Sequence, residues 1–504
     1  MPGADMQRAD ELSQQLQRLT EGVAYLWPEI ILVAGLLLVL LFDLLFKQRK
    51  DIGLATISIS VTSFLLVAQL ILYRVDIEVK DLFEGLLTVS PGAALIKIGF
   101  TLTALVALVM AVHSKKHYQE YFSSSEWLIG LFALLLGAFL MTASSNLLMI
   151  YISIEVVSIS SYLLTGLGRG KRKSEAALKY LLYGAAASAV MLYGMSWLYG
   201  LTGSLDLSTD TFLVGLAAAQ PATVTLAILM MLAGVLFKLG AFPLHIWSPD
   251  VYEATPLPTV TVFSIVPKLA AVFVLFRLVA ATQVAELDWQ LWLGIIAIGG
   301  MTVGNFSALW QRDAKRMLAY SSIAHAAFLL SGILLADQAG LEATVFYALV
   351  YLIMNLAVFY LVQVFENKTG SVSYETFNGL GKVMPYTSVL LLVTMISLTG
   401  LPPLAGFNAK LYLFSAVYES YSASNQTILF WVLVIGLLNT VVALFYYIRI
   451  PYLLFFKHTE QTIQDRPQFK WQVVWGTLLV LPLFLLFFRS DWFVDLLNSI
   501  NFVF

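Results

Sequence analysis

Hydrophobic residues in this chain fall into long windows separated by short stretches rich in charge, glycine, proline, asparagine or serine. A helix needs about 20 mostly apolar residues to cross a bilayer, and such windows are typical of membrane-spanning helices. The windows cover residues 27–46, 52–73, 90–112, 127–143, 146–167, 175–200, 222–243, 257–280, 289–309, 316–336, 342–365, 386–415, 428–450 and 472–488. The pattern predicts an all-α polytopic membrane protein of about fourteen helices.

Composition narrows the class further. Of the 504 residues, 59% are hydrophobic and 12% are charged, against about 25% charged residues in soluble domains. The net charge of −2 gives no basic surface for nucleic acid, so we expect the lipid bilayer rather than nucleic acid as a partner. The absence of cysteine excludes disulfides and iron–sulfur ligation by this chain. We expect no metal or cofactor bound by the chain itself.

Basic residues concentrate in alternate loops, which predicts an orientation because cytoplasmic loops carry excess Lys and Arg. With the N-terminus outside, the inside loops hold Lys47, Arg49, Lys50, Lys115, Lys116, Arg169, Lys171, Arg172, Lys173, Arg312, Lys315, Arg316, Lys368, Lys382, Lys457, Arg466 and Lys470. The outside segments hold Arg8, Arg18, Arg74, Lys80 and Arg489. Both termini are therefore expected on the outer side of the membrane.

An internal repeat divides the chain. Residues 175–206 align with 342–373 at a constant offset, matching Tyr180 with Tyr347 and Thr202-Gly-Ser with Thr369-Gly-Ser. The first copy enters its helix from inside and the second from outside, which is the inverted repeat common among transporters. We predict five segments. Residues 1–26 form a polar surface segment, 27–125 the peripheral helices one to three, and 126–281 the first five-helix repeat. Residues 282–455 form the second, inverted repeat, and 456–504 the cytoplasmic loop and the last helix.

Each predicted repeat contains one interrupted helix. Helix seven carries Gly240-Ala-Phe-Pro243, and helix twelve carries Gly400-Leu-Pro-Pro-Leu-Ala-Gly406. Proline removes a backbone donor and clashes with the preceding turn, so both helices are expected to be discontinuous there.

Four charged residues lie deep inside the apolar windows, two of them, Lys238 and Lys410, next to these interruptions. They are Glu155, Lys238, Lys268 and Lys410. A charge at bilayer depth costs about 2.5–3.5 kcal/mol on insertion scales and marks a functional site by default. A lysine in an apolar surround releases its proton more readily than one in water, and an approaching carboxylate reverses this. The set indicates proton translocation; the alternative is a static ion pair that fixes helix register.

Three further residues are secondary candidates. His325 lies between alanines, where it either relays protons between Lys268 and Lys410 or simply packs, since an unperturbed histidine titrates near about pH 6.5. His245 is either a proton-entry group or an interfacial anchor. Lys97, Lys179 and Arg449 lie within about two turns of a helix end, where we expect their charged groups to extend to the membrane interface. For Lys179 the alternative is a proton-entry or relay group.

Three sequence blocks carry a resemblance to a known family. They are KLGAFPLHIWSPDVYEATPLP at 238–258, DAKRMLAYSSIAH at 313–325 and GLPPLAGFNAK at 400–410. These blocks resemble those of the antiporter-like membrane subunits of NADH-quinone oxidoreductase, respiratory complex I. Asp250-Val-Tyr-Glu253 followed by Pro267-Lys268, and a chain that ends soon after the last helix, resemble the N type.

The resemblance implies a proton channel with Glu155 and Lys238 in the first half, Lys268 at the centre and Lys410 in the second half. It implies membrane-arm subunits as partners, a bacterial inner-membrane location, and NADH, FMN, iron–sulfur clusters and a quinone held by the parent complex. Two alternatives stay open: a sodium/proton antiporter subunit with no redox partner, and a structural membrane-arm subunit that does not pump.

Overall fold

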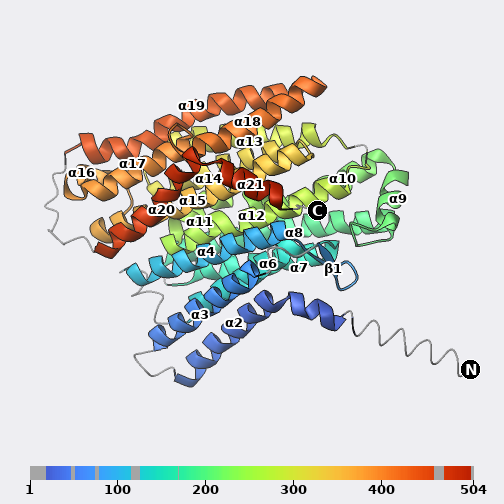
Figure 1. Cartoon of the computed structure of the whole chain (residues 1–504), viewed down its shortest axis with the longest axis horizontal. Helices are drawn as coiled ribbons and strands as arrows, with labels where there is room; N and C mark the ends of the chain where they lie inside the picture. The colour runs from blue at the N-terminus through green and yellow to red at the C-terminus, as the bar shows by residue number, and fades with distance from the viewer. Residues whose placement is uncertain are drawn as a thin grey trace, which may run out of the picture.

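The helices follow the hydrophobic windows closely. A computed structural model describes residues 17, 19–46, 52–73, 79–114, 125–168, 170–285, 287–458 and 470–500 (Figure 1). Its long helices are α2 (Trp27–Phe46), α3 (Ile52–Leu72), α4 (Pro91–His113), α6 (Glu126–Ala143), α7 (Leu147–Gly166), α8 (Lys171–Thr202), α10 (Pro221–Leu239), α12 (Leu257–Ala281), α13 (Trp289–Leu309), α14 (Ala314–Ile333), α15 (Gln338–Thr369), α17 (Pro385–Thr399), α18 (Ala405–Ser424), α19 (Thr427–Phe456) and α20 (Lys470–Phe488).

The fourteen predicted crossings all correspond to helices. Within the described residues, 12 helices are long and apolar enough to cross a membrane on their own. Two windows remain. Helix α14 occupies window 316–336, and window 386–415 is shared by α17 and the first part of α18. Parts of the predicted terminal segments, 1–16, 18, 459–469 and 501–504, lie outside the described residues, as do several basic loop residues such as Lys47 and Arg169.

Local sequence signals set the helix ends. Helix α4 begins with Pro91 after Ser90, whose hydroxyl accepts a hydrogen bond from the third residue of the turn, and this arrangement satisfies a backbone donor that the helix leaves free. Asn146 and Asp337 cap α7 and α15 in the same way. Polar residues next to apolar windows therefore act as boundaries, and the observed starts of α4 and α7 lie one residue after the predicted ones. Helices α8, α15 and α19 extend several residues beyond their windows.

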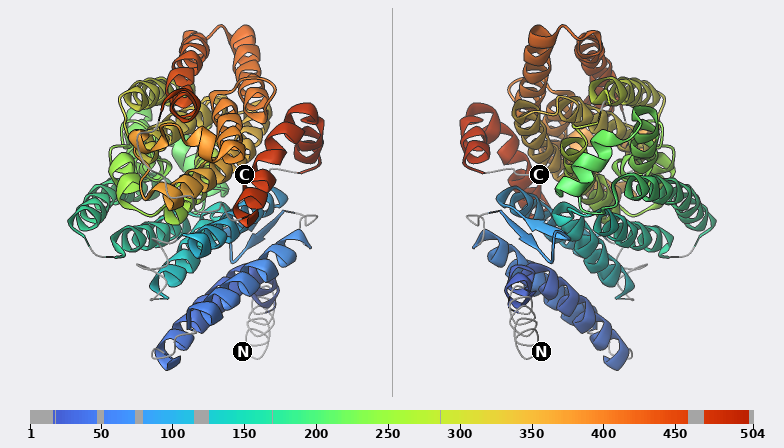
Figure 2. Two further views of the ribbon diagram at one scale, coloured as in Figure 1. Left: turned by 90° about the vertical axis from the view of Figure 1, so that its left-hand side faces the viewer. Right: turned by 90° about the vertical axis from the view of Figure 1, so that its right-hand side faces the viewer.

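Helices α12 and α15 form the centre of the bundle. Helix α12 packs against α4, α6, α10, α14 and α15, and nearly all of its side chains are buried. The peripheral pair α2 and α3 lies at one side of the bundle, and α18 and α19 lie at the other (Figure 2). Leucines such as Leu44, Leu45 and Leu438 on these outer helices are exposed, as expected of faces that meet lipid or a neighbouring subunit.

Both predicted helix interruptions are present and have the same geometry. Helix α10 ends at Gly240 (φ 67°), before a short helix α11 (Trp247–Ala254), and α17 ends at Gly400 (φ 86°), before α18. In each case the glycine amide donates to carbonyls three and four residues earlier. A left-handed residue at this position is the usual helix C-terminus, and glycine adopts it without a steric penalty.

The aligned repeat segments have matching structures. Helices α8 and α15 are each 32 residues long and each ends on a left-handed glycine, Gly203 and Gly370. Their bounds differ by the same offset as the sequence alignment. The inverted relation between the two halves, and the five predicted segment boundaries, remain predictions.

Several short elements were not predicted from sequence. An antiparallel hairpin, β1 (Lys80–Leu82) with β2 (Leu87–Val89), lies at one end of the bundle, where Leu87 pairs with Ser144 of the loop before α7. Helices α9 (Asp210–Ala218) and α21 (Asp491–Ser499) pack against α8 and α15 respectively. Helix α16 (Leu380–Val383) and the 3₁₀ turn η1 (Tyr374–Phe377) pack against α19. We call the end with β1 and β2 the hairpin end.

Candidate functional site

Three predicted lysines lie inside the bundle next to the interrupted helices. Lys238 on α10, Lys268 on α12 and Lys410 on α18 have exposed fractions of 0%, 1% and 5%. Burying a lysine ammonium is costly unless polar partners compensate. The partners of each amine therefore determine what the site can do.

Lys268 binds the neighbouring helix α14. Its Nζ donates to the Ser322 hydroxyl at 2.8 Å and to the Ser322 carbonyl at 3.2 Å, and the Tyr252 hydroxyl lies 3.4 Å from the same serine oxygen. The amine also packs beside the α10 break, since a Cβ built on Gly240 would lie 3.2 Å from Nζ. Lys268 therefore contacts both the interrupted helix and the helix that carries the predicted histidine.

His325 is held between two phenol hydroxyls. Its Nδ1 lies 2.7 Å from the Tyr347 hydroxyl, and its Nε2 lies 3.1 Å from the Tyr447 hydroxyl, which also hydrogen-bonds to Ser321. Every one of these groups can both donate and accept a hydrogen bond. The predicted histidine is thus part of a connected polar chain; its relay role stays a prediction, because a buried histidine that only packs needs hydrogen-bond partners as well.

Lys410 is placed against the end of α17. Its Nζ donates to the Thr399 carbonyl at 2.7 Å and lies 4.8 Å from the centre of the Phe328 ring. The last carbonyls of a helix lack intrahelical partners and carry partial negative charge, which favours a cation. The missing side chain of Gly400 leaves room for this amine, since a Cβ there would lie 2.6 Å from Lys410 Cδ.

Lys238 and Glu155 are close to one another in the fold but are not ion-paired. The Glu155 carboxylate accepts a hydrogen bond from Ser188 on α8. Within the described residues no acceptor reaches Lys238 Nζ, which instead lies about 6 Å from three aromatic ring centres. The structure thus has the carboxylate withdrawn from the lysine, which is one of the two arrangements that the predicted charge switch requires.

The other two secondary candidates, Lys179 and His245, are less buried than the three lysines. Lys179 has a half-exposed side chain and pairs with Glu175 and Asp250, both at 3.0 Å. His245 lies in the segment between α10 and α11, half-buried, with its ring 5.9 Å from that of Phe242. Neither side chain is hydrogen-bonded to a buried lysine in the described part of the chain.

The expectation that the Lys97 ammonium extends to the membrane interface was wrong. This lysine on α4 is buried and donates to the Glu29 carboxylate of α2 at 2.6 Å. Arg449 donates instead to the carbonyls of Leu309 and Gln311, both at 3.3 Å. Sequence position near a helix end did not reveal that a partner from a distant segment would cover Lys97.

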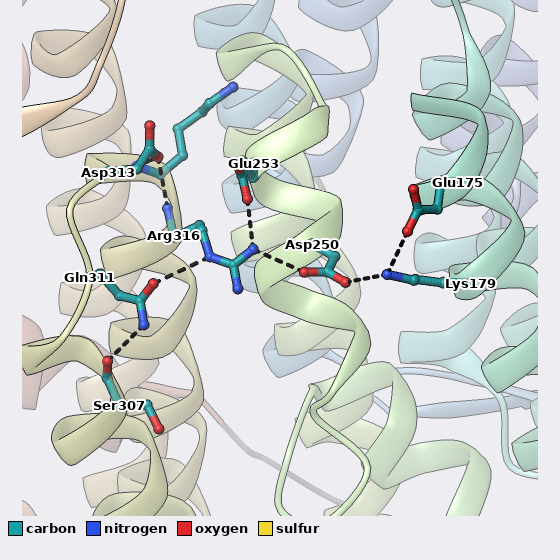
Figure 3. A network of polar contacts seen from close by, with 9 residues as sticks. Glu175, Lys179, Asp250, Glu253, Ser307, Gln311, Asp313 and Arg316 are labelled. Atoms are coloured by element: carbon teal, nitrogen blue, oxygen red, sulfur yellow. Dashed lines mark hydrogen bonds and ion pairs between the residues drawn. The ribbon is translucent and has the colours of Figure 1, made fainter. Parts of the chain in front are cut away.

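Ion pairs join the two halves of the bundle at the end opposite the hairpin. Asp250 of α11 accepts from Lys179 of α8 and from Arg316 of α14, each at 3.0 Å, and Arg316 also pairs with Glu253 at 2.6 Å (Figure 3). We call these four residues the Asp250 network. Burial alone would raise the pKa of the Asp250 carboxyl, but the bonds from Lys179 and Arg316 hold it below its ordinary value. Asp250 therefore stays ionised and acts as a bridge rather than as a proton acceptor.

The site also contains residues that sequence reasoning missed. Ser321 and Ser322 lie one turn before His325 on α14, so helical spacing places all three on one side of that helix. This signal was available in the sequence. Tyr347, Tyr447 and Thr399 were not identifiable, because their roles depend on which helices meet.

The geometry and the comparisons together define the class. A polytopic helical bundle with lysines buried beside two interrupted helices has the layout of an ion-transporting membrane protein. The family model described as NADH:quinone oxidoreductase/Mrp antiporter, transmembrane, matches residues 144–440. NADH-quinone oxidoreductase subunit N of Chlorobium chlorochromatii is 36% identical over 488 residues, covering 94% of both chains. The chain belongs to the NADH-quinone oxidoreductase subunit N family.

Solved structures agree on the fold. A chain of respiratory complex I from Thermus thermophilus matches with a TM-score of 0.78 and 27% identity, covering 94% of this chain and 100% of that one. A chain of the Mrp complex from Dietzia sp. matches with a TM-score of 0.80 and 18% identity, covering 94% of this chain and 96% of that one. The second likeness concerns the fold alone.

Proposed function

We propose that this chain is the proton-translocating membrane-arm subunit of an NADH-quinone oxidoreductase. In this proposal partner subunits carry electrons from NADH through FMN and iron–sulfur clusters to a quinone, and this chain couples that reaction to proton export. The chain itself supplies no redox centre and contributes to a translocase. The observation that carries the proposal is the set of three buried lysines, Lys238, Lys268 and Lys410, on or beside the two interrupted helices, together with His325 hydrogen-bonded to Tyr347 and Tyr447.

The residues have distinct roles in this proposal. Lys238, with Glu155 beside it, loads a proton in the first half of the chain. Lys268 and His325 pass protons along the centre, since their hydroxyl partners can donate and accept. Lys410, held by the end of α17, releases the proton in the second half.

The membrane placement is also part of the proposal. Both termini and the hairpin end face the periplasm of the bacterial inner membrane, and the Asp250 network faces the cytoplasm. Lys179 and His245 then lie toward the cytoplasmic side, where they serve proton entry. The other membrane-arm subunits and lipid cover the exposed outer helices.

The test is NADH-driven proton pumping in inverted membrane vesicles. Lys238→Ala and Glu155→Gln are compared with Lys382→Ala, which removes an exposed lysine of the short helix α16, and a native gel checks assembly of the complex. We expect pumping to collapse in the first two variants and to persist in the third. Unchanged pumping in assembled Lys238→Ala complexes would favour the structural alternative, and sodium-dependent transport without NADH would favour the antiporter.

A further inference from the structure

Lys238 differs from the other buried lysines in what surrounds its amine. Lys97, Lys268 and Lys410 each donate a hydrogen bond of 2.6–2.8 Å to an oxygen acceptor. Lys238 Nζ, which is fully buried, has no acceptor within the described residues. A buried ammonium without any compensating interaction would be very costly, so the amine can carry its charge there only if another feature stabilises it.

Three aromatic rings from three helices converge on this amine. The Nζ lies 5.8 Å from the ring centres of Tyr162 on α7 and Tyr180 on α8, and 5.9 Å from that of Phe237 on α10. A cation within about 6 Å of a ring centre is attracted by the negative face of the ring, and the attraction is larger where water is excluded. Rings gathered around one amine form an aromatic cage, the arrangement that proteins use to bind ammonium ligands.

The rings are fixed by one another and by the interrupted helix. Tyr162 meets Tyr180 edge to face at 4.7 Å, and Tyr180 stacks on Trp247 with ring centres 4.2 Å apart and planes at 12°. The Trp247 indole donates to the Phe237 carbonyl at 3.1 Å. Trp247 is the first residue of α11, so the cage is braced by the segment just beyond the break.

We propose that Tyr162, Tyr180 and Phe237 form an aromatic cage that holds Lys238 as an ammonium while Glu155 is withdrawn, with Trp247 bracing the cage. These are positioning residues for Lys238, and the inference rests on the proposed function. The reason is that the rings attract the charged amine and gain little from the neutral one. The cage therefore substitutes for the carboxylate that is hydrogen-bonded to Ser188.

The groups that face the amine define what a pH experiment reports. Glu155 and Tyr162 face it from α7 and Tyr180 from α8; Lys268 of α12 lies on the other side of the break, beside Gly240. Replacing one ring leaves Glu155 and Lys268 unchanged. A shift in the pH profile of such a variant can therefore be assigned to the ring.

The experiment compares Tyr180→Phe with Tyr180→Leu in the assembled complex, with NADH-driven pumping in inverted vesicles measured from pH 6 to 9. Phenylalanine keeps the ring, so we expect the pH profile to stay in place. Leucine keeps apolar bulk but loses the ring, so we expect the alkaline limb to move toward acid by about 0.5–1 pH unit, a three- to tenfold change in proton concentration. A leucine profile in the wild-type position, or equal shifts in both variants, overturns the cage.

Assembly and the underlying proton function are tested separately. If the Tyr180→Leu complex does not assemble, 4-fluorophenylalanine and 3,4,5-trifluorophenylalanine are introduced at position 180. These residues keep the shape of the ring but weaken its negative face. An acid shift of the pumping pH profile that grows with fluorination supports the cage, and an unshifted profile overturns it. Lys238→Ala decides the proposed function independently. If Lys238→Ala abolishes pumping and the pH profile of Tyr180→Leu is the same as that of the wild type, only the cage is refuted. If pumping is unaltered in Lys238→Ala, the proton role of Lys238 itself is refuted.

Discussion

The buried pair between Glu29 and Lys97 offers a quantitative test of how the peripheral helices are attached. Their side chains are 6% and 8% exposed and their charged atoms are 2.6 Å apart. Removing one partner of a buried ion pair costs about 3–5 kcal/mol, because the other charge is left uncompensated. Lys97→Met should show this strongly, since the second Glu29 carboxylate oxygen is already buried without a donor in the described part of the structure.

The double variant separates pairing from packing. Replacing both charges with apolar groups of similar size is often close to neutral, so Glu29→Leu combined with Lys97→Met should recover most of the stability that either single change loses. The measurement is the temperature at which the subunit is lost from the purified complex, followed on native gels, with Lys382→Met as the exposed-lysine control. Additive losses in the double variant would show that the two charges do not stabilise one another, and the reasoning would be refuted.

Two further predictions concern the interrupted helices and the ends of the bundle. Gly400→Ala should reduce pumping at least tenfold in assembled complexes. The left-handed backbone costs about 1–2 kcal/mol for a non-glycine residue, and the new Cβ would displace Lys410. Gly370→Ala is the matched control and should keep pumping, because Gly370 has a similar φ of 80° but nothing lies within 4 Å of the new Cβ. Asp250→Asn should lower thermal stability because it removes the ion pair with Arg316. The pKa of Asp250 in the folded protein is depressed. The stabilisation by the ion pair is therefore fully present above the ordinary aspartate pKa of about 3.9, and it is lost only as pH falls through the lower folded value. The stability difference between wild type and Asp250→Asn should therefore be constant from pH 8 to 5, and a difference that fades within that range would contradict the assignment.

The sequence predicted the helices well because the bilayer imposes a local rule. Each crossing must satisfy its backbone hydrogen bonds internally and be apolar over about 20 residues, so the limits of α2 and α13 agree exactly with their windows. The two interruptions were predictable for the same reason, since Gly240 and Gly400 with their following prolines act on their own turns. Short elements outside the apolar windows, such as β1, β2 and α11, give no comparable signal.

Three of the buried lysines could be predicted, but their partners could not. A lysine in an apolar window is unusual enough to mark Lys238, Lys268 and Lys410 from sequence alone. Whether such a lysine meets a serine, a helix end or aromatic rings depends on which helices lie side by side. Lys97 shows the limit most clearly, because its partner Glu29 is 68 residues away in the chain.

By itself the sequence determined the membrane class, the positions of the helices and the three deeply buried lysines Lys238, Lys268 and Lys410, since each of these depends on the composition of a short segment. The tertiary structure decided that Glu155 is bonded to Ser188 rather than to Lys238, that His325 lies between two tyrosines, and that Asp250 bridges the two halves. These features depend on contacts between helices distant in sequence, and such contacts are set by packing of whole helix faces rather than by any local pattern.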